Sequence, residues 1–428
     1  MKIAVALHSC MDLGGIINHT EQLIGGFRDL GHEAHLYELV YSDFVQGQGK
    51  SGDFEFGGPS GIPFAQGKGW NFPKNARLAY KNSAVLADAK HILNHYDLVI
   101  WTVPVPPKNK QQLGNDKWPE LYALEPEVKQ VAFIHDGNAA SHATHLYDVA
   151  EHLSGLACVH GCALNSADFL PIPRALVVNP QFMPIRDVLD WDDKHHGFVN
   201  MQTFKAWKHV HELVQAIAYM PPKTAGELRE IAGKGIEYQY MTSEDKCKEA
   251  YFHNDPDKPF HTRKFWDVAL ENGMKHHDYW PTADVDEWLK MARVLVDPSW
   301  SKKYSKIGGH WNRVVVDAMM RGAVPVAQKR GMGTELFQEG VHYIALDNAR
   351  DPQDYADIVL EASHMSAMQA RGFQAAAREV LGMFDRKVVA QRVIDLAHGN
   401  IETETGTQDA SLFKKYEDLM FDHYGVLV

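Results

Sequence analysis

The sequence predicts an α/β protein of two Rossmann-like domains that face each other across a cleft. Apolar runs typical of buried strands alternate with stretches of helical periodicity, which indicates parallel sheets with helices on both faces. The alternation restarts after a polar, charged stretch at residues 187–196, which we interpret as a hinge. The length of 428 residues, at about 150 residues per domain, suggests two or three domains.

The first half of the chain opens with a strand, a helix and a second strand. Lys2 to His8 is a continuous apolar run, as expected for a parallel strand buried on both faces. Gly14 and Gly15 open a helix with apolar residues at helical spacing, and Gly31 ends it. The strands predicted after this helix are Ala34–Val40, Asp97–Val103, Lys129–His135, Leu156–Val159 and Ala175–Asn179.

The second half repeats the pattern. The predicted elements are a strand at Gly197–Asn200, a helix at His209–Tyr219, strands at Ile236–Met241 and Arg293–Asp297, a helix containing Asp317–Arg321, and strands at Val324–Ala327 and Tyr343–Leu346. We expect one domain over residues 1–186, a second over 187–385, and helices over 386–428 that cross back to the first domain. The last of these helices is predicted at Leu412–Tyr424. In such folds, ligands bind at the carboxyl ends of the strands.

Composition excludes several classes of protein. Acidic residues outnumber basic ones by 55 to 43, which argues against a surface coated with positive charge for nucleic acid but not against a local basic patch. No apolar run approaches the roughly 18 to 20 residues that cross a bilayer. The apolar start at Met1–Leu7 is too short for a signal sequence. We therefore expect a cytoplasmic protein without a membrane partner.

Cysteine and histidine do not predict a metal centre. The four cysteines are too few and too scattered for a disulfide framework. Cys158, His160 and Cys162 superficially match a zinc clip, but Cys158 falls in a buried strand and no second ligand pair follows at a suitable distance. The chain has 24 histidines, yet pairs such as His91 and His95 assemble no closed ligand set. We expect no metal site.

One glycine pair and one polar pair, each after a predicted strand, are candidates for ligand binding or catalysis. Gly14 and Gly15 let the backbone approach a ligand, and the helix that follows favours an anion; a plain tight turn is the alternative. His135 and Asp136 follow a strand, where they can orient a hydroxyl group or handle a proton. Equally, they can cap the strand and the helix after it. His135 and Asp136 are the candidate catalytic residues.

The segment from Ser299 to Gly322 is the richest in candidate binding residues. Lysines and an arginine flank a Gly-Gly turn at a helix start, so backbone amides, the helix dipole and cations converge on a diphosphate. Asp317 in that helix can accept hydrogen bonds from ribose hydroxyls. Lys208 stands at another helix entrance, where a lysine binds phosphate as a point charge. Surface lysines in solvated loops are the alternative. The candidates are Lys205, Lys208, Lys306, Gly308, Gly309, His310, Arg313 and Asp317.

These pieces, in this order, resemble the GT-B glycosyltransferases of the retaining, family-4-like type. Gly14 and Gly15 match the glycine-rich first loop, and His135-Asp136 match the strand-end pair. Lys208 matches the donor-phosphate lysine, and Asp317 takes the place of the second glutamate, which in the family holds the ribose. The resemblance covers residues 1 to about 350 in element order. It implies a GT-B fold, a nucleotide-sugar donor and transfer with retention of configuration.

The sequence departs from the family pattern at two positions. Thr203 stands where the family has an arginine, so that Lys205 or Arg313 would have to supply that charge. Gly309 stands where the family has the first glutamate of its pair. A lysine-rich loop in place of this glutamate also occurs in the phage DNA α-glucosyltransferases, which Trp207-Lys208 and residues 235–241 further resemble.

A glycine-rich insert at residues 41–81 is the candidate acceptor-binding segment. It carries five basic residues against three acidic ones, interleaved with aromatic residues, a combination that suits a flipped or unpaired base. A lid that packs its aromatic residues on the body of the domain is the alternative. The candidate acceptor-binding residues, together with a nearby loop lysine, are Lys68, Trp70, Lys74, Arg77 and Lys108.

Together, the residues and the resemblance predict a cytoplasmic glycosyltransferase without a cofactor or a required metal. Its donor would be a UDP-sugar, and the resemblance points to a hydroxymethylated pyrimidine in phage-type DNA as the acceptor. Transfer to a saccharide or lipid, epimerisation of a nucleotide sugar, and nucleotide binding without catalysis stay open as alternatives. The sugar and the oligomeric state are not predicted.

Overall fold

The chain divides into two compact units, each described here by itself. The first contains Met1–Phe182 and a segment that begins at Met383, and the second contains Met183–Gly382. In this computed structural model, the described residues are 1–8, 14–40, 77–104, 117–135, 146–180, 188–202, 208–222, 228–232, 262–277, 282–299, 311–329, 332, 336–347 and 349–405.

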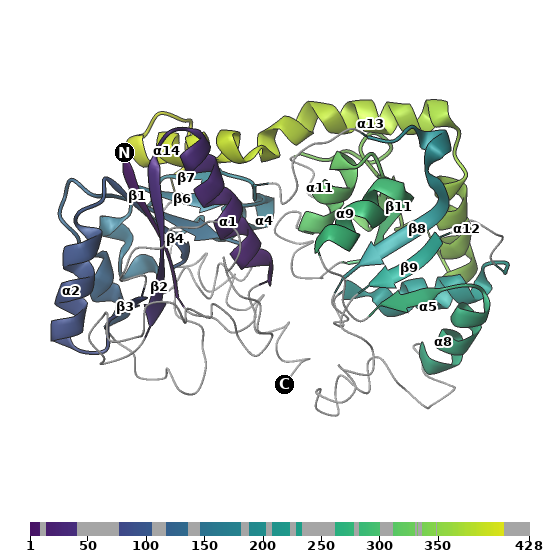
Figure 1. The fold of residues 1–428 in the computed structure, drawn as a ribbon, viewed down its shortest axis with the longest axis horizontal. Helices are drawn as coiled ribbons and strands as arrows, with labels where there is room; N and C mark the ends of the chain where they lie inside the picture. The colour runs from purple at the N-terminus through teal and green to yellow at the C-terminus, as the bar shows by residue number, and fades with distance from the viewer. Residues whose placement is uncertain are drawn as a thin grey trace. The chain divides into compact units, whose positions relative to one another are not determined.

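The first unit is built on a parallel sheet that has seven strands among the described residues (Figure 1). Its strands, in spatial order, are β3 (Arg77–Ala79), β2 (Glu33–Val40), β1 (Lys2–His8), β4 (Leu98–Val103), β5 (Lys129–Ile134), β6 (Gly155–Cys158) and β7 (Arg174–Leu176). The strand order reverses between β1 and β4, which places the ligand crevice of this fold type at their carboxyl ends. Residues of β4, β5 and β6 are almost wholly buried, because helices cover both faces of the sheet.

The described helices of the first unit include one from the end of the chain. They are α1 (Gly14–Asp29), α2 (Ser83–Leu93), α4 (Gly161–Ser166) and α14 (Arg386–His398), with short 3-10 turns at Trp118–Tyr122 and Ala150–His152. Helix α14, yellow in Figure 1, packs against the purple α1. A Cβ atom on Gly26 would collide with the carbonyl of Arg386, and one on Gly155 would meet Leu396. Small residues therefore let α14 approach both α1 and β6 closely.

The second unit is a parallel sheet that has six strands in the described part of the chain. In spatial order, they are β10 (Lys275–His277), β9 (Leu228–Ala232), β8 (His195–Met201), β11 (Ala292–Asp297), β12 (Val324–Ala327) and β13 (Ile344–Ala345). Its helices are α5 (Val210–Tyr219), α8 (Thr262–Glu271), α9 (Thr282–Met291), α11 (Arg313–Met320), α12 (Pro352–Ser363) and α13 (Ala367–Leu381). Here the order reverses between β8 and β11, so their carboxyl ends form the expected ligand crevice.

The predicted α/β class and the alternation of strands and helices are confirmed. Three strands, β3, β9 and β10, were not predicted from the sequence, because two are only three residues long and β9 carries buried Arg229 and Glu230. The Arg229 guanidinium donates to the carbonyls of Pro221 and Asn272, which satisfies a charge inside an apolar layer. The strand predicted at 236–241 and the helix predicted at 412–424 lie outside the described residues.

Part of the polar stretch at 187–196, predicted as a hinge, is packed: Trp191 and Lys194 are buried, whereas Asp190, Asp192 and Asp193 are exposed. Trp191 is buried in the apolar core of the second unit, and its indole N–H donates to the carbonyl of Met365. Lys194 is 2% exposed, and its ammonium donates to the carbonyls of Lys290, Ala292 and Arg321. The burial of Trp191 and Lys194 was not predicted from the sequence, because most of their neighbours are charged; the role of this stretch as a hinge stays a prediction. None of the helices that the structure describes is both long and apolar enough to cross a bilayer.

Candidate active site

His135 lies directly after β5, at the carboxyl edge of the first sheet. Its Nε2 is 2.9 Å from the carbonyl oxygen of Thr102 at the end of β4. Because a carbonyl only accepts, Nε2 must carry the proton, which makes Nδ1 the acceptor nitrogen of the neutral ring. The ring is also packed edge-on against His19 of α1, with ring centroids 4.6 Å apart. This imidazole is thus fixed in both tautomer and orientation, as a residue that orients a hydroxyl group must be.

His160 holds the backbone of His135. It follows β6, is 2% exposed, and its Nε2 donates to the carbonyl oxygen of His135 at 2.8 Å. Its Nδ1 accepts from the N–H of Ala163 and so caps α4. Cys158 and Cys162 are buried free thiols, and burial raises the pKa of the Cys158 thiol to about 12. The residues considered as a zinc clip therefore form a helix cap and a backbone support.

The start of α1 belongs to the same edge of the first sheet. Helix α1 begins at Gly14, as predicted, and Gly15 is in its first turn. His19, which contacts His135, is five residues further, or about 7.5 Å along the helix axis. His8 ends β1 here, and its Nδ1 is 3.1 Å from the hydroxyl of Tyr80. Burial lowers the pKa of His8 to about 3, so this imidazole is neutral at physiological pH.

In the second unit, Asp297 organises the carboxyl edge of the sheet. It ends β11, is 3% exposed, and accepts hydrogen bonds on both carboxylate oxygens. Oδ1 accepts from the side-chain amide of Gln202, which follows β8, and from the N–H of Ser299 at 3.1 Å. The Ser299 hydroxyl donates in turn to Gln202 Oε1 at 2.7 Å. Each hydrogen bond to a charged group contributes about 1.5–3 kcal/mol, so the ends of β8 and β11 are firmly joined.

Lys208 is held by this network through Asn312. Asn312 Nδ2 donates to Asp297 Oδ2 at 2.7 Å, and this bond leaves Asn312 Oδ1 to accept from the ammonium of Lys208. Asn312 is the N-cap residue of α11, so the lysine lies at the N-terminus of that helix. A cation and a helix N-terminus at the carboxyl ends of β8 and β11 are groups that attract an anion such as a diphosphate.

Arg313 and Asp317, both on α11, are the remaining described candidates of the donor site. The guanidinium Nε of Arg313 is 3.9 Å from Asp317 Oδ2, one helical turn further on. Both side chains are mostly buried, at 17% and 10% exposure. The structure thus places Lys208 beside the N-cap of α11, and Arg313 and Asp317 in the first turns of the same helix.

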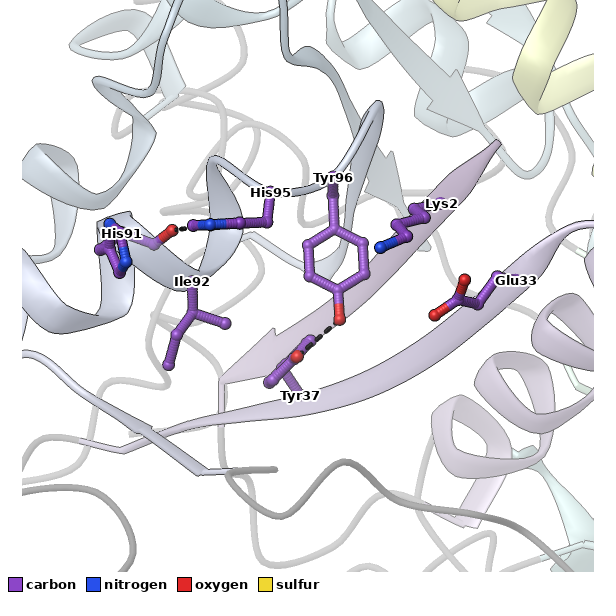
Figure 2. Close-up of a pocket in the computed structure, with 7 residues that line it drawn as sticks. All are labelled: Lys2, Glu33, Tyr37, His91, Ile92, His95 and Tyr96. Atoms are coloured by element: carbon purple, nitrogen blue, oxygen red, sulfur yellow. Dashed lines mark hydrogen bonds between the residues drawn. The ribbon is translucent and has the colours of Figure 1, made fainter.

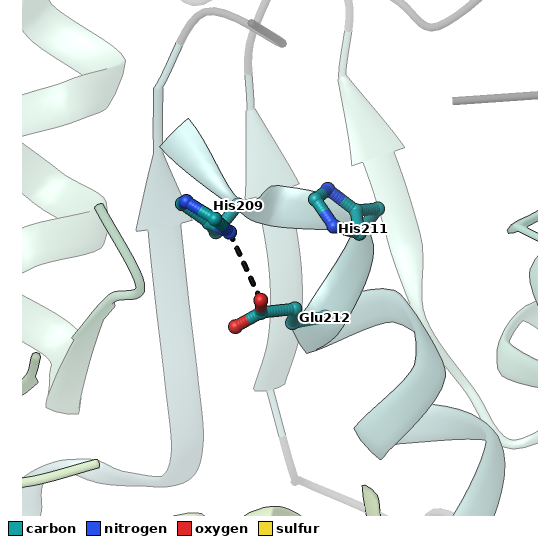
Figure 3. A group of neighbouring side chains, drawn as sticks. All are labelled: His209, His211 and Glu212. Carbon is teal, nitrogen blue, oxygen red and sulfur yellow. Dashed lines mark hydrogen bonds and ion pairs between the residues drawn. The ribbon is translucent and has the colours of Figure 1, made fainter. Parts of the chain in front are cut away.

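The helix entrance after Lys208 is strained. His209 has φ 51° and ψ 23°, a left-handed conformation that no other described non-glycine residue adopts. Such a conformation costs of order 1–3 kcal/mol. His209 Nδ1 is 2.9 Å from Glu212 Oε1, and the His211 ring lies beside that of His209, with centroids 5.5 Å apart (Figure 3). Burial lowers the pKa of His211 to about 4.

Several predicted site residues lie outside the described residues. They are Asp136, Lys205, Lys306, Gly308, Gly309, His310, Lys68, Trp70, Lys74 and Lys108. Arg77 begins β3, whose other end joins Tyr80 at the carboxyl edge of the sheet. The proposed roles of Arg77 and of the residues outside the described part of the chain remain predictions.

Sequence reasoning missed the residues that support the site: Thr102, His160, Gln202, Asp297, Ser299 and Asn312. Asp297 and Ser299 did carry a signal, because polar residues that directly follow an apolar strand mark the ligand-binding edge of a parallel sheet. Gln202 follows β8 in the same way.

An open pocket of about 300 Å³ lies elsewhere in the first unit (Figure 2). It is lined by Lys2, Glu33, Tyr37, His91, Ile92, His95 and Tyr96. Lys2 and Glu33 are the first residues of β1 and β2, so this pocket opens at the amino edge of the sheet, away from His135. The Tyr37 and Tyr96 hydroxyls, 2.6 Å apart, bond to each other in it. We therefore do not assign it to the candidate active site.

Comparison with known proteins supports the fold. No family model and no curated protein sequence matches the chain. Among solved structures, Anabaena HepE in complex with UDP and glucose matches with a TM-score of 0.62 at 16% identity, covering 93% of this chain and 100% of HepE. An α-glucosyltransferase in complex with UDP-glucose and DNA containing an abasic site also has a TM-score of 0.62, at 14% identity and 93% and 99% coverage. The lipopolysaccharide outer core galactosyltransferase WaaB matches with a TM-score of 0.56, at 12% identity and 94% and 100% coverage. The chain therefore has the GT-B fold that these glycosyltransferases share.

Proposed function

We propose that the protein is a glycosyltransferase that moves a sugar from a UDP-sugar to an acceptor hydroxyl with retention of configuration. The observation that carries the proposal is the anion site of the second unit, where the Asp297–Asn312 network holds Lys208 at the N-terminus of α11. Structures with the same fold in complex with UDP or UDP-glucose support the identity of the donor.

In the proposed reaction, the donor's diphosphate binds at the start of α11. The bond between the sugar and the diphosphate breaks, and the positive charges of Lys208 and Arg313 together with the helix N-terminus stabilise the negative charge that develops on UDP. Asp317 accepts hydrogen bonds from the ribose. Because protein cations supply this stabilisation, we propose that the transfer step requires no metal.

At the edge of the first sheet, His135 and Asp136 position the acceptor for attack from the face that the leaving group occupies. The His135 ring is fixed by Thr102 and His19, with Nδ1 as its acceptor nitrogen. It can therefore accept a hydrogen bond from a sugar or acceptor hydroxyl.

We propose a hydroxymethylated pyrimidine in DNA as the acceptor. The basic and aromatic insert at 41–81 supports this choice, as do structures of the same fold with DNA, one of which contains a hydroxymethyluracil base. The similarity to WaaB, named for lipopolysaccharide, favours a saccharide as the second candidate.

Replacing Lys208 by methionine tests the donor site. We expect UDP affinity, measured by titration calorimetry, to fall at least tenfold and turnover to fall with it. Lys275→Met is the matched control, because this lysine is 57% exposed and lies at the amino end of the second sheet's edge strand β10. UDP affinity within twofold of the wild type in Lys208→Met would overturn the donor-site assignment.

Transfer of labelled glucose from UDP-glucose tests the acceptor. The substrates to compare are duplex DNA containing 5-hydroxymethylcytosine or hydroxymethyluracil, unmodified DNA of the same sequence, and a lipopolysaccharide core oligosaccharide. We expect transfer to hydroxymethylated DNA alone, with an α-anomeric linkage by NMR. Transfer to the oligosaccharide alone would establish the second candidate, and isomerisation of the donor without an acceptor would establish an epimerase.

A further inference from the structure

Three side chains of the metal-ligand type meet where α5 begins. The potential ligand atoms of His209, His211 and Glu212 all lie within 4.8 Å of one another. Figure 3 shows them around the entrance and first turn of the helix, with Glu212 directed toward the ring of His209. Within the described residues, no other group of three or more histidine, cysteine or acidic side chains lies so close together.

The backbone places His209 in this group. Its left-handed conformation, at φ 51°, turns the residue before the helix back toward the first turn, where Nδ1 comes within 2.9 Å of Glu212 Oε1. Glycine or asparagine adopts this conformation with less strain than histidine does. A histidine at this position therefore strains the backbone, and the feature that the strain maintains is the direction of the imidazole toward Glu212.

The donor set matches the preference of zinc. Two imidazole nitrogens and one carboxylate oxygen are a common set of three protein ligands for Zn²⁺, with a fourth position for water. Ligand bonds of about 2.0–2.1 Å in a tetrahedron bring ligand atoms about 3.3 Å apart. His209 Nδ1 and Glu212 Oε1 are already 2.9 Å apart. Rotation of these two side chains, which are 17% and 26% exposed, can bring their ligand atoms to the remaining tetrahedral distances.

We propose that His209, His211 and Glu212 form a binding site for a divalent transition-metal ion of the Zn²⁺ type. The ion would tie the residue before α5 to its first turn and so fix the strained turn that directly follows Lys208. The site has no step in sugar transfer, so it stands or falls independently of the proposed function.

Metal titration of the chelator-treated full-length protein tests the site. Zn²⁺ is measured by competition with a chromophoric chelator, and Co²⁺ by its visible absorption, which reports a tetrahedral site directly. The variants are His209→Asn, which keeps a residue that tolerates the left-handed turn, and Glu212→Gln, which keeps the size of the side chain. His91→Asn is the control, because His91 on α2 and His95 just after that helix form a different histidine pair, with centroids 4.7 Å apart.

We expect the wild type and His91→Asn to bind one equivalent of Zn²⁺ that both site variants bind at least tenfold more weakly. The tetrahedral Co²⁺ spectrum and the Zn²⁺-dependent rise in Tm should be lost with it. If both variants bind Zn²⁺ and Co²⁺ as the wild type does, the proposal is wrong, and the group is only a hydrogen-bonded helix entrance. If His209→Asn also lowers the Tm of the metal-free protein, its loss of Zn²⁺ binding could reflect a change in the fold. The Zn²⁺ affinity of Glu212→Gln then decides whether these side chains bind the metal.

Discussion

Replacing Asp297 by asparagine tests whether this buried carboxylate orients the side chain that holds Lys208. In the wild type, Oδ1 accepts from Gln202 and Ser299, and Oδ2 accepts from the amide nitrogen of Asn312. An asparagine would keep its oxygen where the two donors converge and point its own NH₂ group at Asn312. To avoid two opposed donors, Asn312 must turn its amide over, and its nitrogen then faces the ammonium of Lys208.

The expected cost is one hydrogen bond to a charged group, about 1.5–3 kcal/mol. If that bond pre-positions Lys208 for the diphosphate, UDP affinity should fall about 10- to 100-fold, at 1.4 kcal/mol for each factor of ten. Titration calorimetry with UDP measures the change in affinity. Thermal unfolding reports separately whether the variant is folded.

A double-mutant cycle isolates the mechanism. In a Lys208→Met background, Asp297→Asn should change the UDP binding free energy by less than about 0.5 kcal/mol, because the side chain it orients is gone. Asp286→Asn is the control, since Asp286 pairs with Arg321 at the other end of α11. Additive effects in the cycle, or an unchanged UDP affinity in Asp297→Asn, would refute the reasoning.

Three further substitutions, one of them with a matched control, test the supporting structure. Lys194→Met leaves three buried carbonyls without their donor and should cost about 2–4 kcal/mol in urea unfolding. Burial lowers the pKa of Lys194 to about 7, whereas an unfolded lysine titrates near 10.4, so the unfolded state binds more protons between these values. The wild type should therefore gain stability over the variant as the pH rises from about 7 to about 10, and a pH-independent difference would contradict this. His160→Asn keeps the helix cap but removes the hydrogen-bond donor to the His135 carbonyl. We expect kcat to fall several-fold, with little change in KM for UDP-glucose or in Tm. An unchanged kcat would exclude a positioning role for His160. Gly26→Ala should lower the free energy of unfolding by about 1–3 kcal/mol, because the added methyl group collides with α14. Its control, Gly372→Ala, lies in open space on α13 and should raise the free energy of unfolding by about 0.5–1 kcal/mol. Similar effects of the two substitutions would argue against the close helix contact.

The fold was predictable because its central strands are apolar on both faces. β1, β4 and β11 stand out in the sequence as largely apolar runs, and their carboxyl ends predict the edge where ligands bind. β9 escapes this rule, because Arg229 and Glu230 are buried within it and bond to Asn272 and His277, 43 and 47 positions further along the chain. Periodicity alone carries no information about such partners.

Candidate site residues could be chosen from the sequence where a residue type and a strand end coincide, as at His135. Its supports were not, because their roles depend on contacts between residues far apart in the chain. Gln202 and Ser299 are 97 positions apart, yet their side chains bond to each other. His160 shows the same limit: its spacing to two cysteines gave only a superficial match to a zinc clip, and only the direction of each ring nitrogen identifies it as a cap and a backbone support.

The packing of α14 on α1 and β6 has a consequence for how the chain is made. The first unit is assembled from two parts of the polypeptide that Met183–Gly382 of the second unit separates. During synthesis, Met183–Gly382 leaves the ribosome before α14 emerges to cover Gly26 and Gly155. The surface of α1 and β6 around these two glycines therefore stays uncovered until this long intervening segment has been made.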